Sequence, residues 1–110
     1  MELKRVVVTG LGALTPVGNT YPEFWENILK GVSGAGPITH FDASKFKTQF
    51  ACEVKGFNAT DFLDRKEVRK MDLYTQFAIV CAKEAIEDCG MDLEKEDLNR
   101  IGVIYGVGIG

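Results

Sequence analysis

The chain has 110 residues, of which 45% are hydrophobic and 26% charged, an ordinary composition for a soluble globular domain. Its formal net charge of −3 is too small to favour nucleic acid as a partner of the whole chain. The first residues contain no apolar signal-peptide core, and no apolar run reaches the length needed to span a membrane. We therefore expect a cytoplasmic protein that has no membrane segment and binds no nucleic acid.

The cysteines and the histidine do not form a recognisable metal or redox motif. Cys52, Cys81 and Cys89 have no metal-binding or redox spacing. On one helix, the Cα atoms of Cys81 and Cys89 would lie about 12 Å apart, which is beyond disulfide reach. His40 is the only histidine, so it cannot contribute to a two-histidine site. The sequence thus predicts small buried free thiols, no metal site and no bound cofactor.

The chain begins with a short β-branched run, Val6 to Val8, that predicts a buried strand. A turn-rich stretch over residues 9–19 follows. Gly10-x-Gly12 directly after a strand could open a dinucleotide-binding loop, but Thr15 stands where the third glycine would fall. Pro16 then breaks the helix that would receive a pyrophosphate. A nucleotide-binding oxidoreductase is the least supported of the functions considered.

The first helix is predicted to begin at Thr20, whose spacing to Glu23 is that of a capping box with Pro22 in the first turn. Gly31 is expected to end it. Residues 32–37 are rich in Gly, Ser and Pro and predict a loop. Alternation of apolar and polar residues over 50–55 then predicts a half-exposed strand near a sheet edge.

A second helix is predicted to begin after Asp64. A 100° step per residue places four cations within about 140° of its circumference and Val68 and Met71 on the opposite side. These cations form what we call the basic face: Arg65, Lys66, Arg69 and Lys70. Leu73 would fall among them in a continuous helix, so we predict a break at Asp72, which is itself a good N-cap. The basic face is either a solvated surface or a docking site for an acidic partner.

Residues 73–89 predict the longest helix, ended by Gly90, and its apolar residues cover most of the circumference. Such a helix is expected to be buried between layers. The last ten residues, 101–110, alternate bulky side chains with glycines and carry no charge. They predict a strand covered on both faces in a parallel or mixed sheet, with its glycine face open to close backbone approach. Because such a strand needs neighbours, we expect the chain to be the front piece of a larger domain.

Several of these stretches together resemble the N-terminal part of the β-ketoacyl-acyl carrier protein synthases, most closely the type II elongation enzymes. The order and spacing of the similar stretches cover the chain from Arg5 to Gly110. They are Arg5 to Gly12, Thr15 to Asn19, Ser33-Gly34, Pro37-Ile38, Phe41-Asp42, Arg65 to Glu67, Arg69 to Asp72, and Gly106-x-Gly108-Ile109-Gly110.

The resemblance implies an α/β, thiolase-like layered fold (α/β/α/β/α) with a mixed sheet, of which residues 1–110 would be the N-terminal portion. It also implies an acyltransferase of fatty acid biosynthesis. In that reaction a cysteine thiolate takes an acyl group from acyl carrier protein, and decarboxylation of malonyl-acyl carrier protein gives a carbanion. Attack of the carbanion on the acyl thioester makes a β-ketoacyl chain. Family members are homodimers formed by sheet extension.

The resemblance assigns two sets of site residues. Lys66, Arg69 and Lys70 match the family's docking surface for acyl carrier protein, and Ile109 matches a residue that lines the acyl-chain pocket. Val107 departs from the small polar residue common at its position. The family's nucleophilic cysteine and two histidines lie downstream of a segment like 106–110, so no catalytic residue is assigned, Cys52 included. The 110 residues alone are expected to be inactive.

Other functions remain open from the sequence. A polyketide-type ketosynthase, or a chain-length partner that lacks the nucleophile, would share these features. A non-catalytic module that docks acyl carrier protein would share the basic face.

Overall fold

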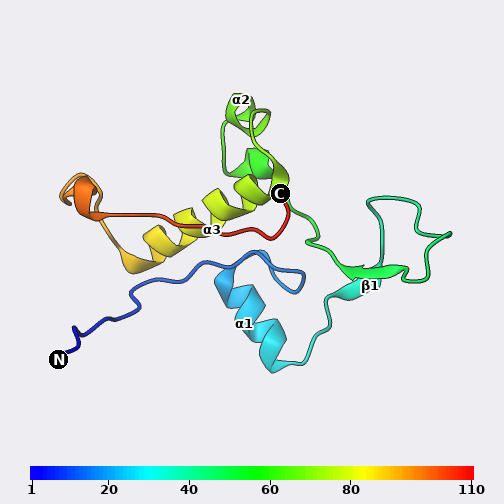
Figure 1. The fold of residues 1–110 in the computed structure, drawn as a ribbon, viewed down its shortest axis with the longest axis horizontal. Helices are drawn as coiled ribbons and strands as arrows, with labels where there is room; N and C mark the ends of the chain where they lie inside the picture. Colours follow the sequence, from blue (N-terminus) through cyan, green and yellow to red (C-terminus); the bar gives the residue numbers. More distant parts are fainter.

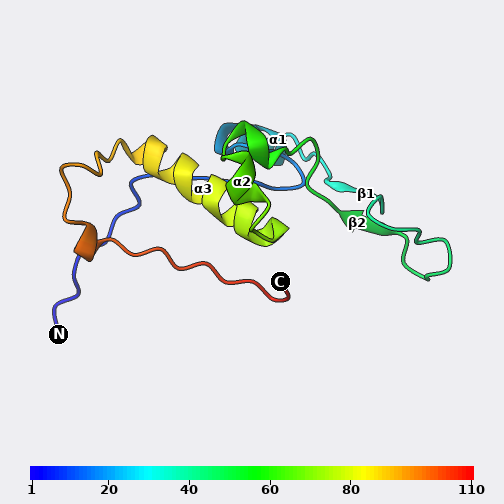
Figure 2. The same ribbon diagram turned by 90° about the horizontal axis from the view of Figure 1, so that it is seen from above.

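Three helices, one two-stranded sheet and two 3₁₀ turns make up the regular structure of residues 1–110, described by a computed structural model (Figure 1). In chain order these are α1 (Tyr21–Leu29), β1 (Ala35–Pro37), β2 (Phe50–Cys52), η1 (Ala59–Asp61), α2 (Arg65–Val68), α3 (Leu73–Cys89) and η2 (Leu98–Arg100). The long helix α3 has α1 and α2 beside it, while the β1–β2 hairpin projects to one side (Figures 1 and 2). None of the helices is both long and apolar enough to cross a lipid bilayer.

The predicted start and end of the first helix are confirmed. The Thr20 hydroxyl accepts a hydrogen bond from the backbone N–H of Glu23, and Pro22 lies in the first turn of α1. The Glu23 carboxylate accepts from the backbone N–H of Asn19 at 3.0 Å, one residue before the cap. Gly31 follows the helix with φ of +68°, a conformation that favours glycine.

The break between the second and third helices is also confirmed. The Asp64 carboxylate caps α2 by accepting from the backbone N–H of Lys66 at 2.7 Å. The regular part of α2 is shorter than predicted and ends at Val68, after which tighter turns lead to Asp72. α3 begins directly after Asp72 and ends at Gly90, whose φ is +70°.

The sheet is smaller than the sequence predicts. β2 covers the first half of the predicted strand and pairs antiparallel with β1, with Gly36 opposite Ala51. β1 lies in the stretch predicted to be a loop because it is rich in Gly and Pro. It forms a strand because its backbone pairs with that of β2. This two-stranded antiparallel pair is the only sheet of the chain, so the predicted mixed sheet is not formed within residues 1–110.

The strands predicted at Val6 to Val8 and at 101–110 are not formed. Both segments are exposed, and the residues Val6 and Ile104 have 88% and 100% of their full solvent exposure. The physical reason is that a strand requires a neighbouring strand to receive its backbone hydrogen bonds, and no segment of the chain lies in that position. The 101–110 segment instead runs back along α3 as an unpaired chain (Figures 1 and 2).

The prediction that α3 is buried between layers is wrong for this chain. Val80 is its only buried residue, because no second layer covers its outer face. That face forms an open, largely apolar hollow of about 510 Å³. Its walls are Ala78, Ile79, Ala82, Lys83, Ile86 and Glu87 of α3, together with Leu93 and Val103.

The close backbone approach predicted for the C-terminal glycines occurs at the N-terminal ones instead. Nothing lies within 4 Å of the Cβ position of Gly102, Gly106 or Gly108, and that of Gly110 is approached by the Tyr74 ring, at 2.9 Å, rather than by backbone. By contrast, a Cβ on Gly12 would overlap the Cys81 carbonyl oxygen of α3, and one on Gly10 would lie 2.8 Å from the Cβ of Cys89. The Gly10-x-Gly12 pair thus lets the chain lie flat on α3, a packing role that accounts for the motif without a nucleotide.

Two carboxylates of α3 hold this flat segment in place. The Asp88 carboxylate accepts from the backbone N–H of Leu11 at 2.9 Å. The Glu84 carboxylate accepts from the N–H of Ala13 at 2.9 Å through one oxygen and from that of Tyr21 at 2.7 Å through the other. Because Tyr21 is the first residue of α1, Glu84 also fixes the start of α1 against α3, where a negative charge is favourable.

Candidate functional site

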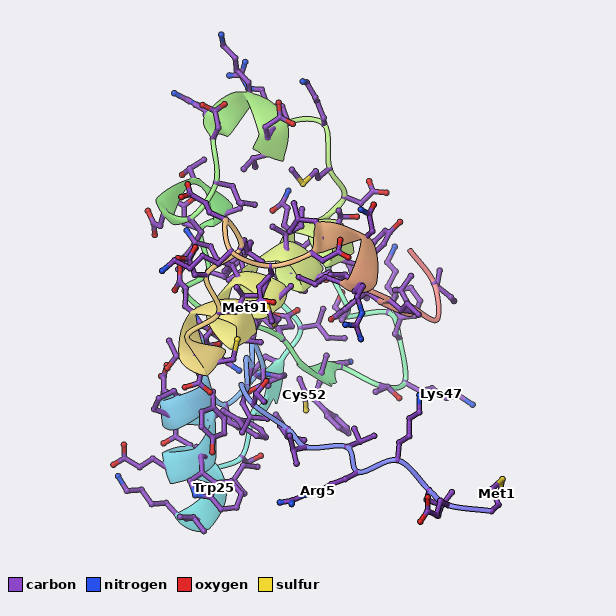
Figure 3. The ribbon with its side chains drawn as sticks, turned by 90° about the vertical axis from the view of Figure 1, so that its left-hand side faces the viewer. Met1, Arg5, Trp25, Lys47, Cys52 and Met91 are labelled. Carbon is purple, nitrogen blue, oxygen red and sulfur yellow. The ribbon has the colours of Figure 1, made fainter.

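The basic face lies on α2 and on the turn that follows it, and its cations point away from the rest of the molecule. The Arg65, Lys66, Arg69 and Lys70 residues are all exposed, whereas Val68 and Met71 are half-buried. Figure 3 shows the nitrogen-tipped side chains of α2 extending into solvent at the upper end of the molecule. The structure therefore confirms the predicted amphipathic arrangement, although the helix itself is shorter.

Three of the four cations of the basic face have no carboxylate partner. The ion pairs within 4.0 Å join Lys30 to Glu26, His40 to Glu53, Lys70 to Glu67, Lys83 to Glu87 and Lys95 to Asp92. Arg65, Lys66 and Arg69 belong to none of these pairs. Only Lys70 is engaged, with its Nζ 3.0 Å from Glu67 Oε1. The face can thus offer three unpaired positive charges to an acidic surface.

Gln76, which is outside the predicted site, forms hydrogen bonds to the backbone at the end of α2. The side-chain amide of Gln76, in the first turns of α3, donates to the backbone carbonyls of Val68 at 3.4 Å and Met71 at 3.2 Å. These carbonyls lie at the end of α2 and of the turn after it, where regular helical hydrogen bonding stops and the Val68 carbonyl accepts from only one backbone N–H, that of Met71, at 3.3 Å. Gln76 thus fixes the direction of α2 relative to α3. No sequence pattern could identify it, because its acceptors are main-chain atoms placed by the α2–α3 turn.

Ile109 lies near the first turns of α3. It lines an open hollow of about 410 Å³ with Asp72, Leu73, Tyr74, Phe77 and Gly110. The residue Ile109 is itself 94% exposed, so only one side of a pocket is present. The predicted acyl-lining role of Ile109 stays a prediction.

A second hollow, of about 390 Å³, contains Cys52, His40 and Glu53 among apolar walls. The Glu53 carboxylate accepts from the hydroxyl of Thr39 at 2.7 Å and from its backbone N–H at 3.0 Å. These hydrogen bonds lower the pKa of Glu53 below its usual value, and the bond from the Thr39 hydroxyl has the larger effect. His40 Nε2 lies 3.8 Å from Glu53 Oε1 and is largely exposed. Figure 3 labels Cys52 on β2.

The cysteines are all free thiols, as predicted, but the prediction that they are buried is wrong: Cys52 is exposed, and Cys81 and Cys89 are half-buried. Partial burial on α3, together with the nearby Glu84 charge, raises the pKa of Cys81, which disfavours its reactive thiolate form. Cys52 is exposed but no base lies within hydrogen-bond distance of it. No group of three or more His, Cys, Asp or Glu side chains is arranged to hold a metal ion.

Comparison with known proteins gives a consistent result over the whole chain. The family model described as "Beta-ketoacyl synthase, N-terminal domain" matches residues 3–110. The 3-oxoacyl-[acyl-carrier-protein] synthase 2 of Synechocystis sp. is 49% identical over 110 residues, which is 100% of this chain and 26% of that protein. The protein of the same name from Staphylococcus aureus is 50% identical over 107 residues, 97% of this chain and 26% of its own length. The chain thus spans about a quarter of these relatives.

A solved structure is similar in fold as well. The ishigamide ketosynthase/chain length factor aligns with a TM-score of 0.74 and 32% identity, covering 80% of this chain and 22% of that one. A score of this size means that most of this chain has the same fold as a part of that larger ketosynthase.

Proposed function

Because the chain belongs to the β-ketoacyl synthase family, we propose that it is the N-terminal portion of a 3-oxoacyl-acyl carrier protein synthase of fatty acid biosynthesis. The observation that carries this proposal is the identity of about one residue in two to synthases of that name, sustained over the full 110 residues. In the proposed reaction, malonyl-acyl carrier protein loses CO₂ to give an enolate. The enolate carbon forms a bond to the acyl carbonyl carbon, and the thioester bond to the enzyme cysteine breaks to release the thiolate.

In this proposal, the role of residues 1–110 is to bind the carrier and to shape one wall of the acyl site. The basic face would dock acyl carrier protein in its acyl and malonyl forms, and the unpaired Lys66 and Arg69 support that role. Ile109 would line the acyl chain, and the apolar Leu73, Tyr74 and Phe77 beside it are compatible with an alkyl ligand. The nucleophile and two histidines would come from sequence outside these residues, and the working protein would be a homodimer.

The proposed reaction is tested by supplying the full-length protein with an acyl-acyl carrier protein and malonyl-acyl carrier protein. We expect one CO₂ released for each 3-oxoacyl-acyl carrier protein formed, with the product two carbons longer than the acyl donor. Mass spectrometry of the acylated intermediate should place the acyl group on a cysteine other than Cys52, Cys81 or Cys89. A matched Cys52→Ser variant should retain full activity.

A second candidate is a chain-length-factor-like or docking partner that lacks the nucleophile. The similarity in fold to the ishigamide ketosynthase/chain length factor favours considering it. It predicts carrier binding without any 3-oxoacyl product and without acylation of the protein. Product formation by the full-length protein on its own would exclude this candidate.

A further inference from the structure

One acidic residue, Glu67, lies beside the basic face and engages one of its four cations. Glu67 Oε1 lies 3.0 Å from Lys70 Nζ, and the two side chains are 54% and 69% exposed. This contact places the Glu67 side chain directly beside that of Lys70. Glu67 therefore lies at the Lys70 edge of the basic face. Its ion pair with Lys70 leaves only three of the four cations unpaired.

An exposed pair of this kind is weak enough to exchange. Two solvated side chains three residues apart on a helix stabilise it by roughly 0.2–1 kcal/mol, because water screens their attraction. An incoming carboxylate that reaches Lys70 can therefore replace Glu67, but it must compete with a carboxylate held at high local concentration. A weakly acidic partner that cannot displace Glu67 gains nothing from Lys70 and is held by Lys66 and Arg69 alone.

We propose that Glu67 is a specificity-determining residue of the basic face, an internal competitor that occupies Lys70 until a strongly acidic partner displaces it. This inference rests on the proposed function, in which the basic face docks acyl carrier protein. Glu67 lowers the affinity for every anionic surface that needs Lys70, and only a strongly acidic partner gains enough from the complete basic face to displace it. Its effect is a trade of affinity for discrimination.

The test is a gain of affinity, which a folding defect does not produce. In the full-length protein, Glu67→Gln keeps the shape of the side chain and removes its charge. We expect holo-acyl carrier protein to bind this variant 2- to 5-fold more tightly at low salt. The gain should vanish at about 1 M salt, where the Debye length falls to about 3 Å. The matched control is Glu94→Gln, an identical charge change in the connector between α3 and η2, which lies far from α2 in Figure 1.

A double-mutant cycle separates the Lys70 pair from a general charge effect. In a Lys70→Met background, Glu67→Gln should lose at least half of its gain, measured as a ratio of Kd values, because no cation remains for the two carboxylates to share. Binding by Glu67→Gln that is unchanged or weaker would overturn the proposal and would mean that Glu67 positions Lys70 for docking. An equal gain for Glu94→Gln would also overturn it. If substitution of Lys66 and Arg69 leaves carrier binding unchanged, the proposed docking role of the basic face is wrong. That result differs from a failure of the Glu67 proposal, in which Lys66 and Arg69 still matter.

Discussion

Gly12→Ala is expected to destabilise the full-length protein by about 3 kcal/mol, near the upper end of the cost of overpacking. The added Cβ would overlap the Cys81 carbonyl oxygen and approach the backbone of α3, which cannot rotate aside as a side chain could. The segment would have to lift from α3, and the hydrogen bonds from Leu11 and Ala13 to Asp88 and Glu84 would lengthen or break. Thermal or urea unfolding of the purified variant measures the loss.

The matched control for Gly12→Ala is Gly36→Ala on β1. Nothing lies within 4 Å of the Cβ position there, and its φ is not in the left-handed region. We expect its unfolding midpoint to stay close to that of the unmodified protein. Equal stability of the two variants would mean that the close contact between residues 10–13 and α3 does not exist in solution.

The double charge reversal Lys66→Glu/Arg69→Glu is expected to weaken binding of holo-acyl carrier protein by on the order of 100-fold at low salt. Lys66 and Arg69 have no carboxylate within ion-pair distance, so their reversal breaks no ion pair of the free protein. The change therefore affects only the binding of acyl carrier protein. Because the Gln76 amide holds α2 through main-chain carbonyls, the reversal leaves the position of the helix unchanged. Isothermal titration of the full-length variant gives the affinity.

The control for this variant carries the same change of charge elsewhere. Lys45→Glu/Lys47→Glu alters two exposed lysines in the loop between β1 and β2, on the projecting hairpin (Figure 1). It lowers the net charge by the same four units but leaves the basic face intact. Similar weakening by both variants would show that only total charge matters, and no weakening by the Lys66/Arg69 variant would remove α2 from the docking role.

The helix boundaries could be predicted from sequence because they depend on contacts within a few residues. Thr20 and Asp64 cap the helices that they precede, and Gly31 and Gly90 adopt positive φ values just beyond helix ends. The break at Asp72 followed from a conflict between Leu73 and the basic face, which is also local. Capping residues and helical periodicity together were thus sufficient to place all three helices.

The strands were less predictable because each depends on a partner distant in the chain. Val6 to Val8 and 101–110 have strand-like patterns, but they find no neighbour within these residues and stay exposed. β1 has no strand-like pattern but is paired with β2. The thiolase-like α/β class is nevertheless confirmed, through the family match and the similar ketosynthase structure, rather than through a sheet formed by this chain.

The candidate site shows the same division. Helical spacing predicted that Lys66, Arg69 and Lys70 share an exposed face, and the structure confirms the exposure. Helical spacing could not predict the ion pair between Lys70 and Glu67, because a contact between residues i and i+3 depends on the rotamers of both side chains. The support from Gln76 was equally hidden. Ile109 was found only through the family resemblance, and its role awaits experiment.

The most direct measurement of the central claim is amine footprinting of the full-length protein with and without holo-acyl carrier protein, read by mass spectrometry. Docking on the basic face predicts that Lys66 and Lys70 lose reactivity when the carrier is added, while Lys45 and Lys47 on the hairpin loop keep theirs. Undiminished reactivity of Lys66 and Lys70 at saturating carrier would contradict the claim.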